Sequence, residues 1–424
     1  MTPILQRAVS KATWRLLPFL FVLYIAAYLD RINVSFAALG MNKDLGLDQA
    51  AYGFGAGIFF LGYVLLEVPS NLVLARVGAR RWIARIMVSW GLVTMALAYA
   101  QGPVSFAALR FLLGACEAGF FPGIILYLTY WFPHASRARA VALFMTATPV
   151  AGLVGSPLSG WIMGLHGVWG HTGWQWLFLL EGLPAVLLGV AVWFTMPAGP
   201  AKAAWLTPDE RQALAGALEA EGADAGPGRL HGVRQGLTSP VVWLFGFIYF
   251  CSVLAMYGLV MFLPQIVAQV TGGDALSVGF HVMVAYGFAA VGMVLIGASS
   301  DRFAERRWHV IGSMGLCLCG MVALSAATGL AGVLAGASLA AMGIWGVLGP
   351  FWGMATRCLG GAAAAAGIAL INSLGNVGGF LGPYLMGWVK SNTGHYSEAF
   401  LYVAAVILLG MASALLVRQP RRNG

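Results

Sequence analysis

The sequence alternates long apolar runs with short polar connections. About 20 apolar residues in a helix cross the roughly 30 Å hydrocarbon core of a bilayer, and the apolar runs here have that length. A backbone inside a bilayer must satisfy its own hydrogen bonds, so each run is expected to form a helix. The pattern predicts an all-α integral membrane protein with 12 transmembrane helices: 16–38, 51–75, 82–100, 104–131, 138–163, 174–196, 240–268, 276–298, 309–328, 331–353, 361–388 and 398–417.

One longer polar segment, 198–239, divides these spans into two sets of six. It contains several Pro and Gly residues, and its Thr207-Pro208-Asp209-Glu210 run has an N-cap, a proline at the first helical position and acids in the first turn. These features predict a short surface helix over 206–220. The expected organisation is an N-terminal six-helix bundle (1–197), a linker (198–239) and a C-terminal six-helix bundle (240–424).

A short basic motif repeats at the same place in both halves. The stretch 71–81 follows the second span and ends in Arg80 and Arg81, while 297–307 follows the eighth span and ends in Arg306 and Arg307. Each stretch is the equivalent loop of its half. The repeat therefore predicts two pseudo-symmetric bundles that rock about a site between them.

Composition excludes an ordinary soluble protein, because 60% of the residues are hydrophobic and 9% are charged. The formal charge of +9 is explained by where the 24 Lys and Arg residues lie. Sorted by the alternating sides of the predicted spans, all lie on the side of the termini except Lys43, Lys390, Arg31 and Arg110. The positive-inside rule then places both termini and the linker in the cytoplasm. The basic excess indicates topology rather than nucleic-acid binding.

Cysteines and histidines give no sign of chemistry. The 5 cysteines lie in or at the edge of apolar spans, which is typical of free buried thiols, and the 7 histidines show no metal-ligand spacing. No nucleophile motif or phosphate-binding loop stands out. We therefore expect neither an enzyme nor a bound cofactor. A signalling sensor is an alternative, but the chain has no extended soluble domain to carry a signal.

Six ionisable residues lie inside predicted spans: Asp30, Arg31, Glu67, Arg110, Glu117 and Glu181. Each costs about 2.5 to 3.5 kcal/mol or more at the bilayer centre, so each is a functional candidate. At a rise of about 1.5 Å per residue, Asp30 and Arg31 lie at the level of Arg110, and Glu117 lies nearer the middle. Glu67 and Glu181 are interpreted as residues that stabilise helix packing rather than contact a ligand.

The two intramembrane arginines suggest a binding site. Two guanidinium groups at one depth form a natural clamp for a carboxylate. The alternative is a pair of structural ion pairs between the first and fourth spans, because Arg110, Gly114 and Glu117 share one helix face. Asp30 and Arg31 are about 100° apart on their helix and must face different partners. In the eleventh span, Asn372 and Asn376 share a face and either hold a ligand or link helices.

The basic motif resembles the signature of the major facilitator superfamily, in which a Gly and an Asp-Arg pair precede a Gly and two basic residues. The first copy keeps Arg76 and Arg80 but has Ala75 at the Asp position, and the second copy keeps Asp301 and Arg302. The resemblance implies the major facilitator fold with a cytoplasmic gate of ion pairs. The alternative is that these arginines only fix topology.

Longer motifs resemble the anion:cation symporter family within that superfamily. They are Tyr28-Leu29-Asp30-Arg31-Ile32-Asn33, Glu67-Val68-Pro69-Ser70-Asn71, Arg110-Phe111-Leu112-Leu113-Gly114-Ala115-Cys116-Glu117 and Trp205-Leu206-Thr207-Pro208. The family contains bacterial carriers of tartrate, phthalate and sugar acids, and tartrate-type members are the most similar. The resemblance implies that Arg31 and Arg110 bind the substrate anion or belong to its charge network, that Asp30 and Glu117 carry protons, and that Tyr28 and Tyr63 are pocket phenols.

Thr148 stands where sugar-acid carriers of that family often have Gln, which leaves tartrate-like or aromatic acids open. With all ionised, Asp30 and Glu117 cancel Arg31 and Arg110, so protonating either acid leaves positive charge for an anion. We therefore expect a monomeric, proton-coupled symporter that imports a small organic anion across a bacterial inner membrane by alternating access. The alternative is a proton-coupled antiporter that exports an organic compound.

Overall fold

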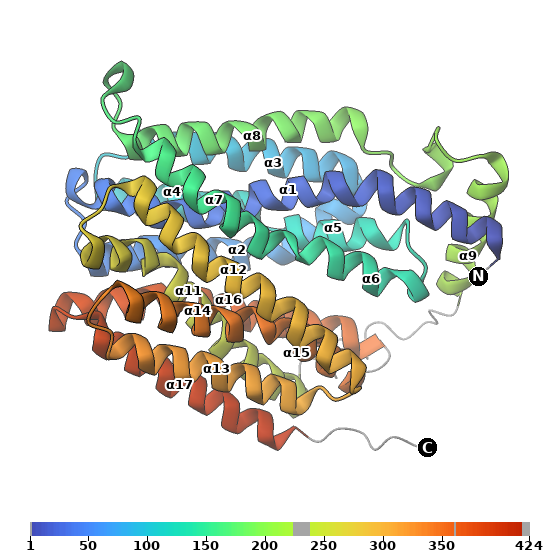
Figure 1. Cartoon of the computed structure of the whole chain (residues 1–424). Helices are drawn as coiled ribbons and strands as arrows, with labels where there is room; N and C mark the ends of the chain where they lie inside the picture. Colours follow the sequence, from blue (N-terminus) through green and yellow to red (C-terminus); the bar gives the residue numbers. More distant parts are fainter. Residues whose placement is uncertain (1, 224–237, 360–361, 418–424) are drawn as a thin grey trace.

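The computed structural model describes residues 2–223, 238–359 and 362–417, and these residues form a bundle of long helices (Figure 1). Helices before the linker are α1 (Pro3–Asp44), α2 (Gln49–Val77), α3 (Ala79–Leu97), α4 (Pro103–Glu117), α5 (Phe120–Thr129), α6 (His134–Met145), α7 (Ala147–Met163) and α8 (Gly173–Thr195). The linker contains α9 (Pro208–Ala223), and short 3₁₀ turns cover Val168–Gly170 and Pro200–Lys202. Helices after it are α11 (Pro240–Thr271), α12 (Ala275–Arg302), α13 (Arg307–Ser325), α14 (Leu330–Gly346), α15 (Leu348–Cys358), α16 (Ala362–Thr393) and α17 (Tyr396–Leu416).

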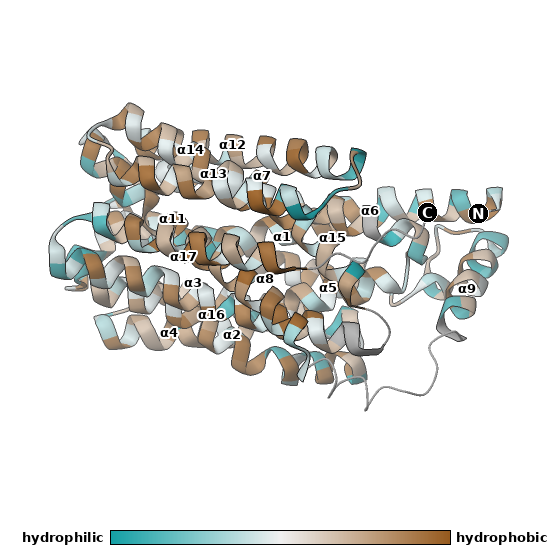
Figure 2. Ribbon diagram, turned by 90° about the horizontal axis from the view of Figure 1, so that it is seen from below, coloured by the Kyte–Doolittle hydropathy of each residue, from teal (hydrophilic) through white to brown (hydrophobic). Residues whose placement is uncertain are grey.

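The helices follow the predicted spans. Within the described residues, 10 helical stretches are long and apolar enough to cross a membrane, with α4–α5, α6–α7 and α14–α15 each counted as one stretch. The two remaining predicted spans, 82–100 and 361–388, correspond to α3 and α16, which are helices of 19 and 32 residues. Hydrophobic residues lie along the length of the helices, and hydrophilic residues gather at the connections and on α9 (Figure 2). The all-helical fold predicted from the apolar runs is confirmed.

The span predicted over 104–131 is present as Pro103–Thr129, but its helix is interrupted. α4 ends at Glu117, Ala118 is extended, and Gly119 has φ 88° before α5 begins at Phe120. The break is braced by α2, where Ser70 donates a hydrogen bond of 2.6 Å to the carbonyl oxygen of Ala118. A Cβ at Gly119 would collide with Ser70 Oγ. Mean hydropathy does not change across such a break, so the apolar run could not reveal it.

The linker helix packs against the N-terminal half. α9 begins with the reciprocal cap that the sequence indicates: Thr207 N–H donates to the Glu210 carboxylate at 2.9 Å, and Glu210 N–H donates to Thr207 Oγ1 at 3.3 Å. Lys11 of α1 forms an ion pair with Glu210 at 2.8 Å. The rings of Trp131 and Trp205 stack at 5.4 Å. These contacts fix one end of the linker to the first half.

The two ends of the bundle differ in how closely the halves meet. We call the end with Pro3, α9 and Leu416 the termini side, and the end with the α1–α2, α11–α12 and α16–α17 connections the far side (Figure 1). At the far side, α2 packs on α16 and α7 packs on α12. A Cβ at Gly53 would collide with the Pro383 carbonyl, and one at Gly160 with the Ala275 carbonyl. Close backbone approach therefore closes the far side.

Hydrogen bonds add to this far-side contact. Tyr52 donates to the carbonyl oxygen of Met261 at 2.7 Å, and Gln49 donates to Gln265 at 3.1 Å. At the termini side, α5, α6 and α15 pack mainly within their own halves. Among residues 2–223, 238–359 and 362–417, no ion pair joins the two halves. The structure is therefore closed at the far side and less tightly joined at the termini side.

Candidate functional site

An ion pair between two membrane helices lies at the centre of the structure. The guanidinium of Arg31, on α1, contacts Oε1 of Glu117, the last residue of α4. Glu117 is completely buried, whereas the Arg31 side chain keeps 14% of its surface exposed. Glu117 Oε2 has no hydrogen-bond partner among the described residues. The pair therefore combines a buried carboxylate with a cation that solvent can reach.

Aromatic residues from both halves surround Arg31. Its Nη1 lies 3.3 Å from the hydroxyl of Tyr257, which comes from α11 in the second half. The guanidinium carbon lies 5.3 Å from the ring centre of Phe59 and 5.6 Å from that of Tyr63, distances typical of cation–π contacts. Arg31 is thus one of the points at which the first half contacts a polar group of the second.

Arg110 has a different environment from Arg31. It is completely buried, its Nη2 donates to the carbonyl oxygen of Ala56 at 3.2 Å, and its guanidinium lies 5.0 Å from the ring of Phe59. Nε and Nη1 have no partner among the described residues. A Cβ at Gly114 would collide with the Phe59 carbonyl, so α2 occupies the space beside Arg110. In this conformation Arg31 reaches solvent and Arg110 does not.

Asp30 faces away from its neighbour Arg31, as the 100° spacing predicts. Its Oδ2 accepts a hydrogen bond of 2.7 Å from the indole of Trp90 on α3, and its Oδ1 lies 3.5 Å from Nδ2 of Asn33. All three residues are completely buried. Asp30 therefore belongs to a polar cluster inside the first half, behind the Arg31–Glu117 pair.

The other predicted binding residues occupy different positions. Tyr28 is buried. Thr148 is buried and donates at 3.0 Å to the carbonyl oxygen of Met145, the last residue of α6. Asn372 donates to Glu67 at 2.8 Å and so links α16 to α2, and Asn376 is half-buried on the same helix. In this conformation Asn372 joins helices, which was one of its two interpretations.

The predicted gate residues lie at the termini side. Arg76, Asp301 and Arg302 are exposed, and Arg80 is half-buried. Asp301 forms its ion pair with Arg306 of its own half. The repeated motif therefore contributes an intra-half ion pair here, and the first copy, with Ala75 in place of an acid, has no equivalent group.

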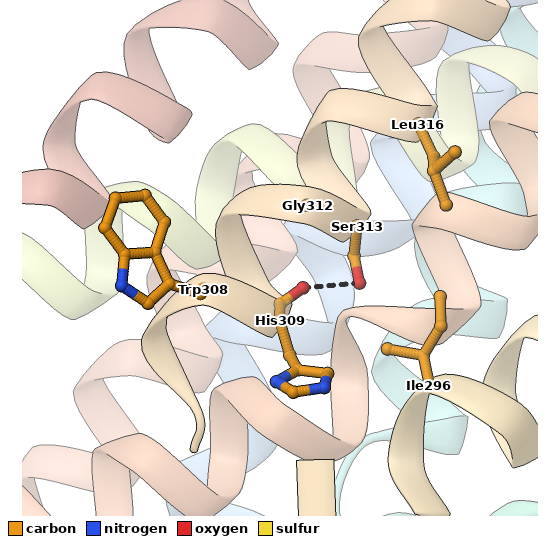
Figure 3. A pocket seen from close by; sticks show the side chains of 6 residues that line it. All are labelled: Ile296, Trp308, His309, Gly312, Ser313 and Leu316. Carbon is orange, nitrogen blue, oxygen red and sulfur yellow. Dashed lines mark hydrogen bonds between the residues drawn. The ribbon is translucent and has the colours of Figure 1, made fainter. Parts of the chain in front are cut away.

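A separate pocket of about 300 Å³ lies between α12 and α13 (Figure 3). It is lined by Ile296, Trp308, His309, Gly312, Ser313 and Leu316. None of these residues contacts the Arg31–Glu117 pair, so this pocket is distinct from the central site. Within the three described ranges, no group of three His, Cys, Asp or Glu side chains is placed to hold a metal ion.

Sequence reasoning missed the aromatic residues that position the charges. Phe59 contacts both guanidinium groups and Trp90 hydrogen-bonds to Asp30. In the sequence of an apolar span, Phe59 and Trp90 cannot be told from other core residues, because only the charged residues that they contact stand out. An indole N–H within a span is nevertheless a donor that needs an acceptor, which is a usable signal. Ser159, which donates to Glu181 at 2.7 Å, was missed for a similar reason.

Comparison with known proteins identifies the chain. The profile of the Major Facilitator Superfamily matches residues 20–383. The chain belongs to the major facilitator superfamily. A protein of Agrobacterium vitis provisionally named a tartrate transporter is 47% identical over 97% of this chain and 91% of its own length. A quinolone resistance transporter of Acinetobacter baumannii is 40% identical over 96% of this chain and 94% of its own length.

This superfamily membership confirms the resemblance seen in the repeated basic motif and makes the chain a multi-pass membrane transporter rather than an enzyme. A crystal structure of a bacterial homologue of the human lysosomal transporter Spinster, in an inward-facing and unoccupied conformation, superposes with a TM-score of 0.77. The two sequences are 19% identical, and the match covers 98% of this chain and 97% of the other. That likeness establishes the major facilitator fold.

Proposed function

We propose that this superfamily member imports a small organic anion with at least one carboxylate group together with a proton, by alternating access. The observation that carries the proposal is the Arg31–Glu117 ion pair, because Arg31 is partly exposed while Glu117 is completely buried. A ligand carboxylate can take the place of Glu117 as the anionic partner of Arg31. The replacement requires that Glu117 lose its negative charge.

Protonation of Glu117 provides that step. In the structure, Glu117 is the anion that occupies Arg31. Once Glu117 takes up a proton, the Arg31 guanidinium has no anionic partner, and a substrate carboxylate can accept its hydrogen bonds. The proton and the anion therefore favour each other's binding, which is the thermodynamic condition for symport. The coupling ion is H⁺, and transport uses no cofactor.

The remaining residues are assigned around this exchange. Tyr257 contacts Arg31 across the interface and would sense whether the guanidinium holds Glu117 or a substrate. Substrate would also contact Tyr28, Tyr63, Thr148, Asn372 and Asn376, with Arg110 supplying positive potential from behind Phe59. Asp30 would be the second proton-binding group. Closure of the termini side would bring together the gate residues Arg76, Arg80, Asp301 and Arg302.

The distribution of cations supports one orientation of the protein in its membrane. On the far side of the described residues the Lys and Arg side chains are Lys43 and Lys390, whereas the termini side carries Arg residues from both copies of the basic motif. The positive-inside rule therefore puts the termini side in the cytoplasm. The protein acts as a monomer in a bacterial inner membrane, and this structure is an inward-facing state.

The identity to a protein provisionally named a tartrate transporter favours a short dicarboxylate as substrate. Purified protein in liposomes with an imposed pH gradient tests the proposal, with tartrate as the first anion. Wild type should accumulate tartrate when the outside is acidic. Glu117→Gln should still bind tartrate but lose the response to the gradient, because its side chain is permanently neutral. Arg31→Ala should lose binding.

Matched controls separate these effects from misfolding. Arg85→Ala removes an exposed arginine that stacks on Trp82 at 4.0 Å, away from the ion pair, and should transport normally. Gradient-driven uptake that continues unchanged in Glu117→Gln contradicts proton coupling at this residue. If Arg31→Ala binds tartrate, sugar acids and aromatic acids as wild type does, the proposal that Arg31 binds the substrate anion is contradicted.

Export of an organic compound in exchange for protons is the second candidate, favoured by the 40% identity to a quinolone resistance transporter. The two functions predict opposite directions of flux. In an exporter, a quinolone would leave the cytoplasmic compartment as protons enter, and tartrate would not compete. Parallel assays in liposomes and in inverted membrane vesicles distinguish the candidates.

A further inference from the structure

The carboxylate of Glu117 lies directly before an interruption in a membrane span. Glu117 is the last residue of α4, Ala118 is extended, and Gly119 has φ 88° before α5 begins. The last carbonyl groups of a helix have no backbone donor from a following turn, so a helix end frays more easily than its middle. In a bilayer no water replaces those donors. The position of Glu117 therefore depends on what holds the end of α4.

α2 holds this helix end on both sides of the carboxylate. Before it, a Cβ at Gly114 would collide with the Phe59 carbonyl, and after it, a Cβ at Gly119 would collide with Ser70. Ser70 is 6% exposed and donates to the carbonyl oxygen of Ala118 at 2.6 Å, so this carbonyl gains a donor that the interrupted helix does not supply. Backbone packing and one serine hydroxyl thus fix the last turn of α4 to α2.

A second helix fixes the direction of that hydroxyl. Trp82 of α3 donates its indole N–H to Ser70 Oγ at 2.9 Å. Because the hydroxyl oxygen accepts from Trp82, its own hydrogen is directed to Ala118. Trp82 directly follows the first copy of the basic motif, 71–81. The contacts therefore run from the termini-side connection between α2 and α3 to the residue after Glu117.

We propose that Ser70, oriented by Trp82, positions the carboxylate of Glu117 against Arg31. Glu117 reaches Arg31 through Oε1, and its Oε2 has no hydrogen-bond partner among the described residues. The direction of this carboxylate therefore follows from the backbone that carries it. Ser70 is a positioning residue that acts through the backbone at Ala118.

The consequence for transport rests on the proposed function. If a substrate carboxylate replaces Glu117 at Arg31, the contact from Ser70 sets how firmly Glu117 competes with the substrate. A shift of the α2–α3 connection as the termini side closes would change this competition through Trp82 and Ser70.

A double-mutant cycle in melting temperature tests the positioning without any substrate. Ser70→Ala removes the hydroxyl, and Glu117→Gln removes the negative charge of the ion pair. Ser70→Ala should lower the melting temperature of wild type by about 2 °C or more beyond its effect in Glu117→Gln, where the ion pair is already lost. Equal decreases in both backgrounds overturn the inference, because the serine then stabilises the helix end alone.

Further variants keep this test decisive. Arg31→Ala gives the same cycle should Glu117→Gln fail to fold, because the Arg31 side chain is partly exposed. Trp82→Phe keeps an aromatic ring but removes the N–H, and it should couple to Glu117→Gln with the same sign. Ser252→Ala is the matched control, because Ser252 is also 6% exposed but donates to the Ile248 carbonyl of its own helix at 3.0 Å. Its effect should be the same in both backgrounds.

Tartrate affinity provides the readout for the proposed function. At neutral pH, Ser70→Ala should bind tartrate about threefold or more tightly than wild type, because a loosely held Glu117 competes less well for Arg31. In the Glu117→Gln background the same change should leave the affinity within about twofold. Weaker binding in both backgrounds would mean damage to the helix end alone and overturns the inference. A wild type that binds no carboxylate refutes the proposed function, and the melting-temperature cycle still decides the role of Ser70.

Discussion

The guanidinium of Arg31 lies 3.3 Å from the hydroxyl of Tyr257, and this contact joins the two halves at the centre of the membrane region. Tyr257 is also fixed by Phe60, whose ring centre is 4.3 Å away. The hydroxyl is therefore held in place by packing and is available to Arg31 without further ordering. The hydroxyl oxygen accepts from Arg31, so its hydrogen can be donated to a substrate carboxylate bound at the guanidinium.

We predict that Tyr257→Phe weakens substrate binding by roughly tenfold. A hydrogen bond to a charged group contributes about 1.5 kcal/mol or more, and about 1.4 kcal/mol corresponds to a factor of 10 in affinity. The ring and its contact with Phe60 remain, so folding should be unaffected. Concentration-dependent uptake of the transported anion gives KM directly.

Tyr384→Phe is the matched control for this change, because Tyr384 is 37% exposed and stacks on Phe380 at 5.9 Å without contacting the ion pair. Its KM should equal that of wild type. A KM for Tyr257→Phe within twofold of wild type would mean that the contact with Arg31 contributes nothing to binding.

The packing of α2 against α4 gives a second prediction. A Cβ at Gly114 would collide with the carbonyl oxygen of Phe59, which is backbone and cannot move away alone. Gly114→Ala should therefore force α2 and α4 apart, at a cost of about 1 to 3 kcal/mol or more. Thermal unfolding in detergent should show a melting temperature lower by several degrees, together with loss of uptake because Arg110 and Glu117 flank this position.

Gly297→Ala separates a steric effect from a general effect of removing glycine. Gly297 lies inside α12, and nothing is within 4 Å of the position that its Cβ would take. Since alanine favours helix over glycine by about 1 kcal/mol, this variant should be at least as stable as wild type. Equal stability of the two variants would contradict the predicted collision at Gly114.

The sequence was sufficient to predict the helices and the buried charges, because both depend on local rules. An apolar run of bilayer length must be helical, and a charge within it must have a partner. Helical geometry also shows that Asp30 and Arg31 face different neighbours. Which neighbours they meet depends on contacts between helices distant in sequence, and no periodicity predicts that Arg31 would contact Glu117 rather than share a space with Arg110.

Other features escaped prediction for physical reasons of the same kind. The break after Glu117 depends on the backbone conformation of Gly119 and on the brace from Ser70. Neither changes the apolar character of the run. Glu181 was interpreted as a residue that stabilises helix packing, and in the structure it accepts a hydrogen bond from Ser159 of α7. This contact becomes visible only when α7 and α8 are packed together.

The pairing of α9 with α1 predicts a pH dependence outside the membrane region. The hydrogen bond from Lys11, with a further one from the Thr207 backbone, lowers the pKa of Glu210 below its ordinary value of 4.5. Because the pKa is lower when α9 is docked, the stabilisation is fully present above pH 4.5 and is lost as the pH falls through the lowered value. Hydrogen exchange of α9 amides measures this.

Glu210→Gln should exchange several-fold faster than wild type at neutral pH, and the two proteins should converge well below pH 4.5. Comparing them at each pH removes the intrinsic pH dependence of exchange. Glu219→Gln changes an exposed acid on the same helix and should match wild type throughout. A difference between wild type and Glu210→Gln that is the same at every pH would contradict the assignment to the Glu210 carboxylate.

The far-side contact predicts a reversible block of transport. Ser391 Oγ accepts a hydrogen bond of 2.9 Å from the Ala50 backbone, so the two positions lie close together across the halves. In a background without the 5 native cysteines, Ala50→Cys with Ser391→Cys should form a disulfide that keeps the far side closed. Uptake should fall almost to zero on oxidation and return on reduction, while each single variant stays active. Full uptake with a complete cross-link would mean that these helices need not separate, and alternating access at this end would be refuted.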